Sequence, residues 1–406
     1  MPRKLYIVFL PVINKDISKG GQVIRDYKMP HHLNIIFKPI NDLCNLNCEY
    51  CHEKRDQELL SSKQLFKPIL YTDLPITKWF PEFVYKFKNI PDIKKINFCW
   101  HGGEPLLLPY DFYRRITHIQ RKQLEETIKY ENVVITNCIN MDKNKIKWLK
   151  KLNIYLSVSC DGPNYLHNQG RFQSIRIFKK FRKNLELVCK ECNSFSLHIV
   201  INQYNLQEYG AIFDFLKLVR PKNGVALGIC FMENNILSGE LLKNFFRNLF
   251  DLWWPERTPY IMELEEIIKG LNFHPPRYCK LAENGCLHFI TVDAQGLLYS
   301  GCQRKEDMKI GYIDDLYVED IINRHLRNIA SLNNKIVGKT FFEYLNCDPR
   351  FIYFQSKGCP NRLNSKNQDP YFPVYADLIT HIAKKLKIDT NRLIEDLMKR
   401  NEKRIS

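Results

Sequence analysis

Short apolar runs alternate with longer amphipathic stretches from residue 33 to residue 232, and this alternation constrains the fold more than any other feature of the chain. We expect strands at residues 33–37, 96–100, 132–136, 153–159, 195–201 and 225–232. Residues 81–87, 110–127, 143–151 and 175–192 have the period of amphipathic helices. Strands that alternate with helices indicate parallel βαβ units, so the sequence predicts an α/β fold containing a partial (β/α)6 barrel.

The chain divides into five expected segments. They are an N-terminal extension (1–28), the barrel (29–235), a helical bridge (236–275), a cysteine-bearing region (276–365) and C-terminal helices (366–406). No apolar run reaches the roughly 18 residues of a membrane span, and the first residues lack the small-residue cleavage site of a signal peptide. We therefore expect a cytoplasmic protein with no membrane partner.

The net charge of +17 raises the question of a nucleic-acid partner. Lysine and arginine are spread along the whole chain, whereas a nucleic-acid-binding surface concentrates them. The same charge would attract an acidic peptide. The chain also holds 14 cysteines, and because disulfides are rare in the cytoplasm, we expect metal-binding or catalytic roles for some of them.

The first cysteine motif follows the first expected strand. Cys44, Cys48 and Cys51 form a C-x3-C-x2-C pattern on one short loop. An iron–sulfur cube normally has four cysteine ligands, so three closely spaced thiolates can hold three irons and leave the fourth open to a small molecule. The alternative is a zinc site with a distant fourth ligand such as His52, although this spacing is uncommon for zinc.

A second motif, His101-Gly102-Gly103-Glu104-Pro105, follows the second expected strand. Paired glycines let a ligand approach the backbone closely. The carboxylate of Glu104 could accept hydrogen bonds from an ammonium group. An ordinary Gly-Gly turn with a solvated glutamate is the alternative interpretation.

Together the two motifs resemble those of the radical S-adenosylmethionine (SAM) superfamily. The resemblance implies that Cys44, Cys48 and Cys51 bind a [4Fe-4S] cluster. It also implies that Tyr50 lies against the adenine of SAM and that Gly102, Gly103 and Glu104 meet its methionine. The cofactor would supply a 5′-deoxyadenosyl radical that abstracts hydrogen, while the protein binds, orients and shields the reactants.

A third element follows the fourth expected strand. Ser159 and Asp161 precede Gly162, and Arg171 lies ten residues after Asp161. This arrangement is similar to that of anaerobic sulfatase-maturase-like enzymes, and the similarity implies that Ser159 and Arg171 contact SAM. Asn137 falls where that group often has Thr-Asn-Gly. A strand end closed by an Asx turn is the alternative for Ser159 and Asp161.

The second cysteine region contains a predicted hairpin with its turn at Gln295-Gly296. It resembles the SPASM extension of peptide-modifying radical SAM enzymes. The resemblance implies that one auxiliary [4Fe-4S] cluster is bound by Cys279, Cys286, Cys302 and Cys359. Arg350 and Ser356 stand where a second cluster would need cysteines, so we expect a degenerate SPASM-like domain with that cluster lost. Cys347 would be a spare thiol or an alternative ligand to Cys359, and a zinc-stapled domain is the alternative to a cluster.

These resemblances imply a radical SAM enzyme that modifies a ribosomally synthesised precursor peptide, by hydrogen abstraction and cross-link formation. An electron donor such as flavodoxin or ferredoxin would be its second partner. Anaerobic sulfatase maturation, which forms formylglycine, is the alternative. It is disfavoured because Gln303 stands where the maturases have an acidic residue that serves as a base. No catalytic base is assigned from the sequence. A basic metal-cluster protein that binds nucleic acid is a third hypothesis, but it leaves Gly102–Pro105 without a role.

Overall fold

The computed structural model describes residues 28–387, apart from 54–73, 173, 193, 233–235, 273, 283 and 347. Almost all of the expected N-terminal extension therefore lies outside the described residues. The same is true of Cys347 and of the expected C-terminal helical segment beyond residue 387.

Six parallel strands form the predicted partial barrel, and they lie side by side in the order of the sequence. They are β1 (His32–Phe37), β2 (Lys95–Trp100), β3 (Lys129–Thr136), β4 (Ile154–Ser159), β5 (Phe195–Ile201) and β6 (Val225–Ile229). The α/β fold class is confirmed. The sixth strand ends at Ile229, earlier than the apolar run suggested.

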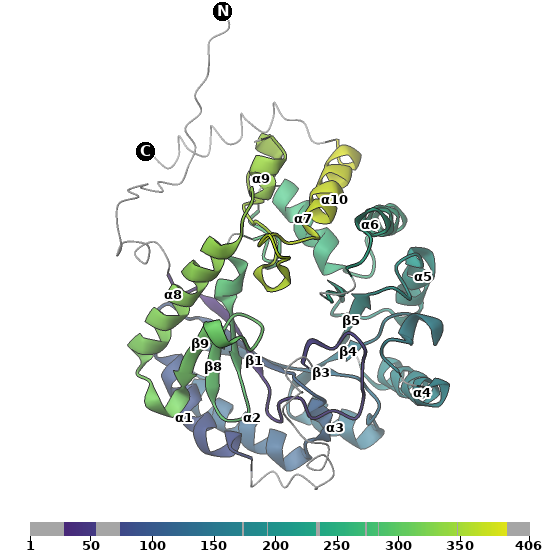
Figure 1. Ribbon diagram of the computed structural model, residues 1–406. Coiled ribbons are helices and arrows are strands. Elements are labelled where there is room, and N and C mark those ends of the chain that lie inside the picture. The colour runs from purple at the N-terminus through teal and green to yellow at the C-terminus, as the bar shows by residue number, and fades with distance from the viewer. Residues whose placement is uncertain are drawn as a thin grey trace, which may run out of the picture.

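Helices follow one another along the outer side of the curved sheet (Figure 1). They are α1 (Ile76–Lys88), α2 (Tyr110–Leu124), α3 (Lys143–Lys151), α4 (Ile175–Glu191) and α5 (Tyr209–Val219). Helix α1 begins before Pro81, although the sequence suggested a start at this proline. Trp79, Phe80 and Phe83 are buried on one face of α1, and their burial outweighs the single backbone hydrogen bond that a proline removes.

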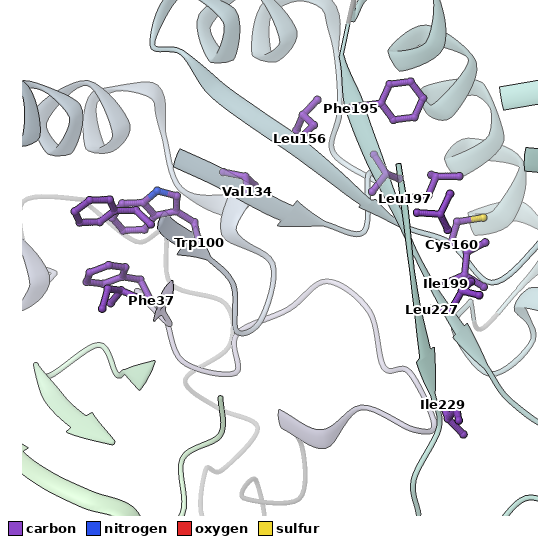
Figure 2. Packing of buried hydrophobic residues seen from close by; sticks show 14 of the residues in the cluster. Phe37, Trp100, Val134, Leu156, Cys160, Phe195, Leu197, Ile199, Leu227 and Ile229 are labelled. Atoms are coloured by element: carbon purple, nitrogen blue, oxygen red, sulfur yellow. The ribbon is translucent and has the colours of Figure 1, made fainter. Parts of the chain in front are cut away.

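Large side chains between sheet and helices fix where the strands end. Phe37 and Trp100 are fully buried last residues of β1 and β2, and their rings stack 4.8 Å apart (Figure 2). The indole of Trp100 also donates to the side chain of Asn132 at 3.0 Å. Phe37 and Trp100 thus anchor the carboxyl ends of β1 and β2, after which both motifs begin.

The cysteine-bearing region continues the same sheet. Strand β7 (Phe289–Val292) pairs in parallel with β1, and β8 (Leu297–Ser300) and β9 (Lys309–Tyr312) follow in antiparallel pairing. The predicted hairpin turn is confirmed, with Gly296 at a φ of +85°. The sheet thus has nine strands, and residues about 250 positions apart become neighbours at its carboxyl edge.

Helices close the remaining side of the molecule. The predicted bridge consists of α6 (Gly239–Trp253) and α7 (Met262–Leu271), and α8 (Val318–Lys335), α9 (Phe341–Tyr344) and α10 (Phe372–Lys385) come later. Helix α10 packs against α6 and α7 (Figure 1). Among the described residues, no helix is long and apolar enough to cross a membrane.

Candidate active site

A cavity of about 310 Å³ opens where the barrel strands end. Residues predicted from widely separated motifs line it together: Cys44, Cys48, Tyr50, Cys51, Gly102, Gly103, Glu104, Ser159, Arg171, Cys302, Gln303 and Cys359. Cys279 and Cys286 are not part of the lining formed by the described residues. Residues of both cysteine regions therefore border one space.

The loop that carries the first cysteines is bonded directly to the Gly-Gly motif. The N–H of Gly103 donates to the carbonyl of Asn41 at 2.6 Å, and the N–H of Glu104 donates to that of Leu43 at 2.8 Å. A Cβ atom on Gly103 would lie 1.9 Å from the Leu43 carbonyl oxygen, which is far inside van der Waals contact. The two glycines are thus required for the contact between the two motifs, as well as for space beside a ligand.

The Glu104 carboxylate is buried at the base of the cavity. Its Oε1 accepts from the N–H of Leu106 at 2.9 Å and from Thr136 Oγ1 at 2.8 Å, and its Oε2 accepts from the N–H of Asn137 at 2.7 Å. Burial nevertheless raises the pKa of Glu104 to about 7. Three of the roughly four acceptor sites of the carboxylate are filled, which leaves Oε2 able to accept one more hydrogen bond.

Asn137 connects Glu104 to the cysteine loop. Its amide Nδ2 lies 3.6 Å from Cys44 Sγ and donates to the side chain of Asn45 at 2.7 Å. The next residue, Cys138, has a φ of +63°, a conformation that glycine adopts most easily. This explains in physical terms why glycine would be the expected residue after Asn137.

Asp161 holds a buried network behind the cavity wall. Arg171 donates to its two oxygens at 2.8 and 3.2 Å, and the hydroxyl of Tyr50 donates to the same carboxylate. The guanidinium of Arg171 also lies 5.6 Å from the centre of the Tyr50 ring. The structure thus places Arg171 and Tyr50 together beside Cys48, while Ser159 lines the cavity at the end of β4.

The environment of the first three cysteines calls for the positive charge of bound iron ions. Burial, followed by the charges of Glu104, Cys48 and Cys51, raises the pKa of Cys44 to about 12, against the hydrogen bond from Leu46. Bound iron would supply the missing positive charge and deprotonate the thiol. A tetrahedral zinc site would need sulfurs about 4 Å apart, and among the described residues no three cysteines have their sulfurs within 4.8 Å of one another. The described cysteines are therefore not gathered as closely as a tetrahedral zinc site requires.

The second cysteine set also converges. A Cβ on Gly285 would lie 2.2 Å from the carbonyl oxygen of Cys279, so the turn before Cys286 packs directly on Cys279. Burial, and then the charges of Cys359 and Cys302, raise the pKa of Cys279 to about 12. The pKa of Cys286 is raised well above its usual range by burial and then by the charges of Cys302, Cys359 and Cys279. The four thiols predicted as auxiliary ligands thus lie close enough to act on one another.

The two positions that lack second-cluster cysteines are occupied by other local contacts. Arg350 pairs with Asp348, and the hydroxyl of Ser356 accepts from the N–H of Gly358 at 3.1 Å. These contacts are those of an ordinary loop, which fits the expected loss of a second auxiliary cluster.

An ion-pair network that the sequence did not reveal joins the two cysteine regions. Glu53, two residues after Cys51, is bonded to Lys38 at 2.6 and 2.7 Å, and Arg304 reaches both Glu53 and Asp42. Burial alone would raise the pKa of Glu53, but hydrogen bonding to His52 and the charge of Lys38 hold it well below its usual range. In the sequence, a charged residue lies two positions from each of Cys44, Cys51 and Cys302. Charged residues are common on any protein surface, so this signal did not reveal the network.

His52, Glu53 and His101 also bring possible metal-ligating atoms within 4.8 Å of one another. Lys38 and Arg304 already neutralise Glu53, and a divalent cation there would be repelled by both. We therefore interpret this group as part of the ion-pair network.

Comparison with known proteins agrees with this geometry. Residues 39–216 match the family model of the radical SAM superfamily. This segment contains the first cysteine motif, the Gly-Gly-Glu motif, Ser159 and Arg171, so the chain contains a radical SAM domain and is an enzyme that uses a [4Fe-4S] cluster and SAM.

More particularly, the chain is similar to anaerobic sulfatase-maturating enzymes. It is 25% identical over 362 residues to the cysteine-type enzyme of Clostridium perfringens, covering 83% of this chain and 91% of that one. It is 23% identical over 366 residues to the serine-type enzyme of Bacteroides thetaiotaomicron, covering 83% and 84% of the two chains.

Solved structures show the same fold. The structure described as native anSMEcpe with bound AdoMet and Kp18Cys peptide has a TM-score of 0.71 and 20% identity, covering 89% of this chain and 99% of that one. Streptococcus suis SuiB bound to its precursor peptide SuiA has a TM-score of 0.51 and 12% identity, covering 81% and 72%. The predicted α/β fold with a partial barrel is thereby confirmed.

Proposed function

We propose that this enzyme abstracts a hydrogen atom from a polypeptide and cross-links the substrate through the resulting radical. When bound, the cluster and SAM supply one-electron cleavage of SAM to a carbon-centred radical. Cys44, Cys48 and Cys51 would hold the cluster, and Gly102, Gly103 and Glu104 would receive the methionine of SAM.

The observation that carries this proposal is the single cavity shared by the predicted radical-cluster cysteines, the predicted SAM contacts and two of the four predicted auxiliary cysteines. The free acceptor site of Glu104 Oε2 suits the SAM ammonium, and Ser159 and Arg171 also line the cavity. Tyr50 borders the same space, where the adenine could lie along its ring. Burial raises the pKa of Glu104, and the positive charge of the SAM ammonium would favour its ionised form.

The auxiliary cysteines Cys279, Cys286, Cys302 and Cys359 would hold one further [4Fe-4S] cluster. Two of them, Cys302 and Cys359, line the same cavity as the radical site. Cross-linking removes two hydrogens from the substrate: one leaves as an atom, and the other leaves as a proton and an electron. The electron consumed in SAM cleavage is thus balanced by one that is released.

A polypeptide substrate is supported by three observations. The solved structures with a similar fold include two with bound peptides. The net charge of +17 would accelerate encounter with an acidic leader. The cavity is bordered by both the barrel and the C-terminal region, so a long ligand could contact both. We expect the substrate to be a ribosomally synthesised precursor peptide that binds more weakly as ionic strength rises.

Sulfatase maturation is the second candidate, favoured by the relatives named above. Gln303 lines the cavity beside Cys302 and its amide cannot take a proton, which disfavours this chemistry. His198 also lines the cavity. Burial, and then the charges of Arg171 and Lys280, lower its pKa to about 4, so its neutral ring could accept a proton only as a weak base.

Two measurements on anaerobically reconstituted protein test the cofactor assignment. Reduced wild-type enzyme should cleave SAM to 5′-deoxyadenosine and carry about eight irons, from two four-iron clusters. Replacement of Cys44, Cys48 and Cys51 by alanine should abolish cleavage and leave about four irons. Replacement of Cys189 and Cys192, which lie at the end of α4, is the matched control and should change neither result. Cleavage by the triple variant would refute the assignment.

The substrate chemistry is tested by co-expression with a precursor peptide encoded beside the enzyme. Each cross-link should lower the peptide mass by about two units, because two hydrogens are lost, and tandem mass spectrometry should show two joined residues. The same mass loss at a single cysteine or serine, with an aldehyde that hydrazine reagents trap, would support sulfatase maturation and refute cross-linking.

A further inference from the structure

Two cations flank the auxiliary cysteines and have no role in the function proposed above. Lys280 follows Cys279 directly, and Arg362 lies three residues after Cys359. Both side chains line the cavity that Cys302 and Cys359 also border. They come from opposite ends of the cysteine-bearing region and meet at the same wall.

Arg362 has unused donors in a buried position. Its side chain is only 7% exposed, and Nη2 donates to Asp369 Oδ2 at 2.7 Å. Its Nε and Nη1 groups have no hydrogen-bond partner among the described residues. An unpaired buried N–H group is costly, so these two donors are suited to a bound group that accepts hydrogen bonds.

The orientation of Arg362 is fixed relative to Cys359. Asp369 accepts from Arg362 and also from the N–H of Cys359 at 2.7 Å, so one carboxylate holds both residues. The guanidinium lies 5.2 Å from the ring centre of Tyr371, which limits its movement further. Burial opposes the charged guanidinium, but Asp369 and then Cys359 outweigh it and raise the pKa of Arg362 well above its usual range.

Lys280 lacks an ion pair. Its ammonium lies 3.2 Å from the hydroxyl of Tyr375 and 5.1 Å from the ring centre of Tyr278. Among the described residues, no carboxylate oxygen lies within 4.0 Å of it, and Glu263 acts on it only from a greater distance. A cation withdrawn from water in this way calls for an anionic partner.

We propose that Lys280 and Arg362 form a cationic flank of the auxiliary cluster and raise its reduction potential. A cube with four thiolate ligands is an anion that becomes more negative on reduction, and its potential depends on local charge and on hydrogen bonds to sulfur. The ammonium of Lys280 stabilises the added electron, and the free N–H groups of Arg362 donate to sulfur. This role rests on the auxiliary-cluster assignment above and adds to it how that cluster would accept the electron released by the substrate.

The test is a redox titration followed by electron paramagnetic resonance. It is carried out on the full chain with Cys44, Cys48 and Cys51 replaced by alanine, so that only the auxiliary couple is observed. In that background, Lys280→Met should disfavour reduction at least tenfold at a fixed solution potential, which is a lowering of 59 mV for a one-electron couple. Lys280→Arg retains the charge and should restore most of the shift.

Lys269→Met is the matched control. The ammonium of Lys269 also lies near a tyrosine hydroxyl, that of Tyr260 at 3.4 Å, but it pairs with Glu266 and is not part of the cavity lining. Its removal should leave the potential unchanged. Arg362→Lys keeps a charge beside Asp369 while removing the two free donors, and it should also lower the potential.

The possible results separate the two proposals. Unchanged potentials in Lys280→Met and Arg362→Lys, with about four irons retained, would overturn the cationic flank and leave the cluster assignment intact. A parent protein without auxiliary irons would instead refute the cluster assignment itself. Equal shifts in Lys280→Met and Lys269→Met would show a general effect of net charge, which also overturns a specific role.

Discussion

Replacement of Glu104 by glutamine should weaken SAM binding while leaving the cluster in place. A hydrogen bond between a carboxylate and an ammonium contributes about 1.5–3 kcal/mol, which corresponds to roughly one to two decades of affinity. Glutamine is nearly the same shape, so most of the contacts with Leu106 and Thr136 can be kept. The side-chain NH2 of glutamine would face the N–H of Asn137 and could not accept a hydrogen bond from it. We expect this loss to affect folding more than it affects selectivity for a cation.

The pH dependence of SAM affinity gives a sharper form of this prediction. Burial raises the pKa of Glu104 to about 7 in the protein without ligand, so about half of the molecules hold a neutral carboxyl at that pH. Only the carboxylate attracts an ammonium. The ionised fraction falls from about one half at pH 7 to about one eleventh at pH 6, so wild-type affinity should fall about fivefold over this interval. The glutamine variant should show no such change.

Equilibrium dialysis of SAM against reconstituted enzyme between pH 6 and 7.5 measures both effects. This range stays below the ordinary pKa of an α-amino group, about 7.7–8.0. Glu263→Gln is the matched control because Glu263 is also a fully buried carboxylate with a raised pKa that accepts a backbone N–H, from Leu227 at 2.9 Å, but it is not in the cavity lining. Equal slopes in wild type and Glu104→Gln, or equal loss of affinity in Glu263→Gln, would refute the role of Glu104.

Two further predictions concern stability and loop geometry. Burial raises the pKa of Glu263 from 4.5 to about 6, so its ionisation costs the folded protein about 2 kcal/mol above pH 6, and that penalty disappears below pH 4.5. Glu263→Gln should therefore increase the free energy of unfolding by about 2 kcal/mol at pH 8 and by less than half of that at pH 5, as measured by denaturant titration; an equal gain at both pH values would contradict it. Gly103→Ala should cost the protein about four irons, because the added Cβ would strike the Leu43 carbonyl next to Cys44, whereas Gly210→Ala, which meets no atom within 4 Å, should retain all of them. Full iron content in Gly103→Ala would show that the loop can move aside.

The fold was predictable because its signals are local. Short apolar runs mark β1 to β6 in order, since alternate residues of these strands are buried. The start of α1 was not predictable, because Pro81 is a local signal for a helix start while the burial of Trp79 and Phe80 is a tertiary effect. The hairpin turn at Gly296 was predictable, but its attachment to β1 through β7 was not, since pairing between distant strands leaves no local pattern.

The sequence by itself determined which side chains we propose for the chemistry, because cysteine spacing and a Gly-Gly-Glu string indicate ligand type within a few residues. Only the tertiary structure decided that Cys44 and Cys302 line one cavity, since β1, β7 and β8 become neighbours in one sheet although they are far apart in the sequence. It also decided the buried ion pairs of Glu53 and the unpaired donors of Arg362. A charged residue has the same letter whether it is solvated or buried, and its energy depends on the groups that folding places around it.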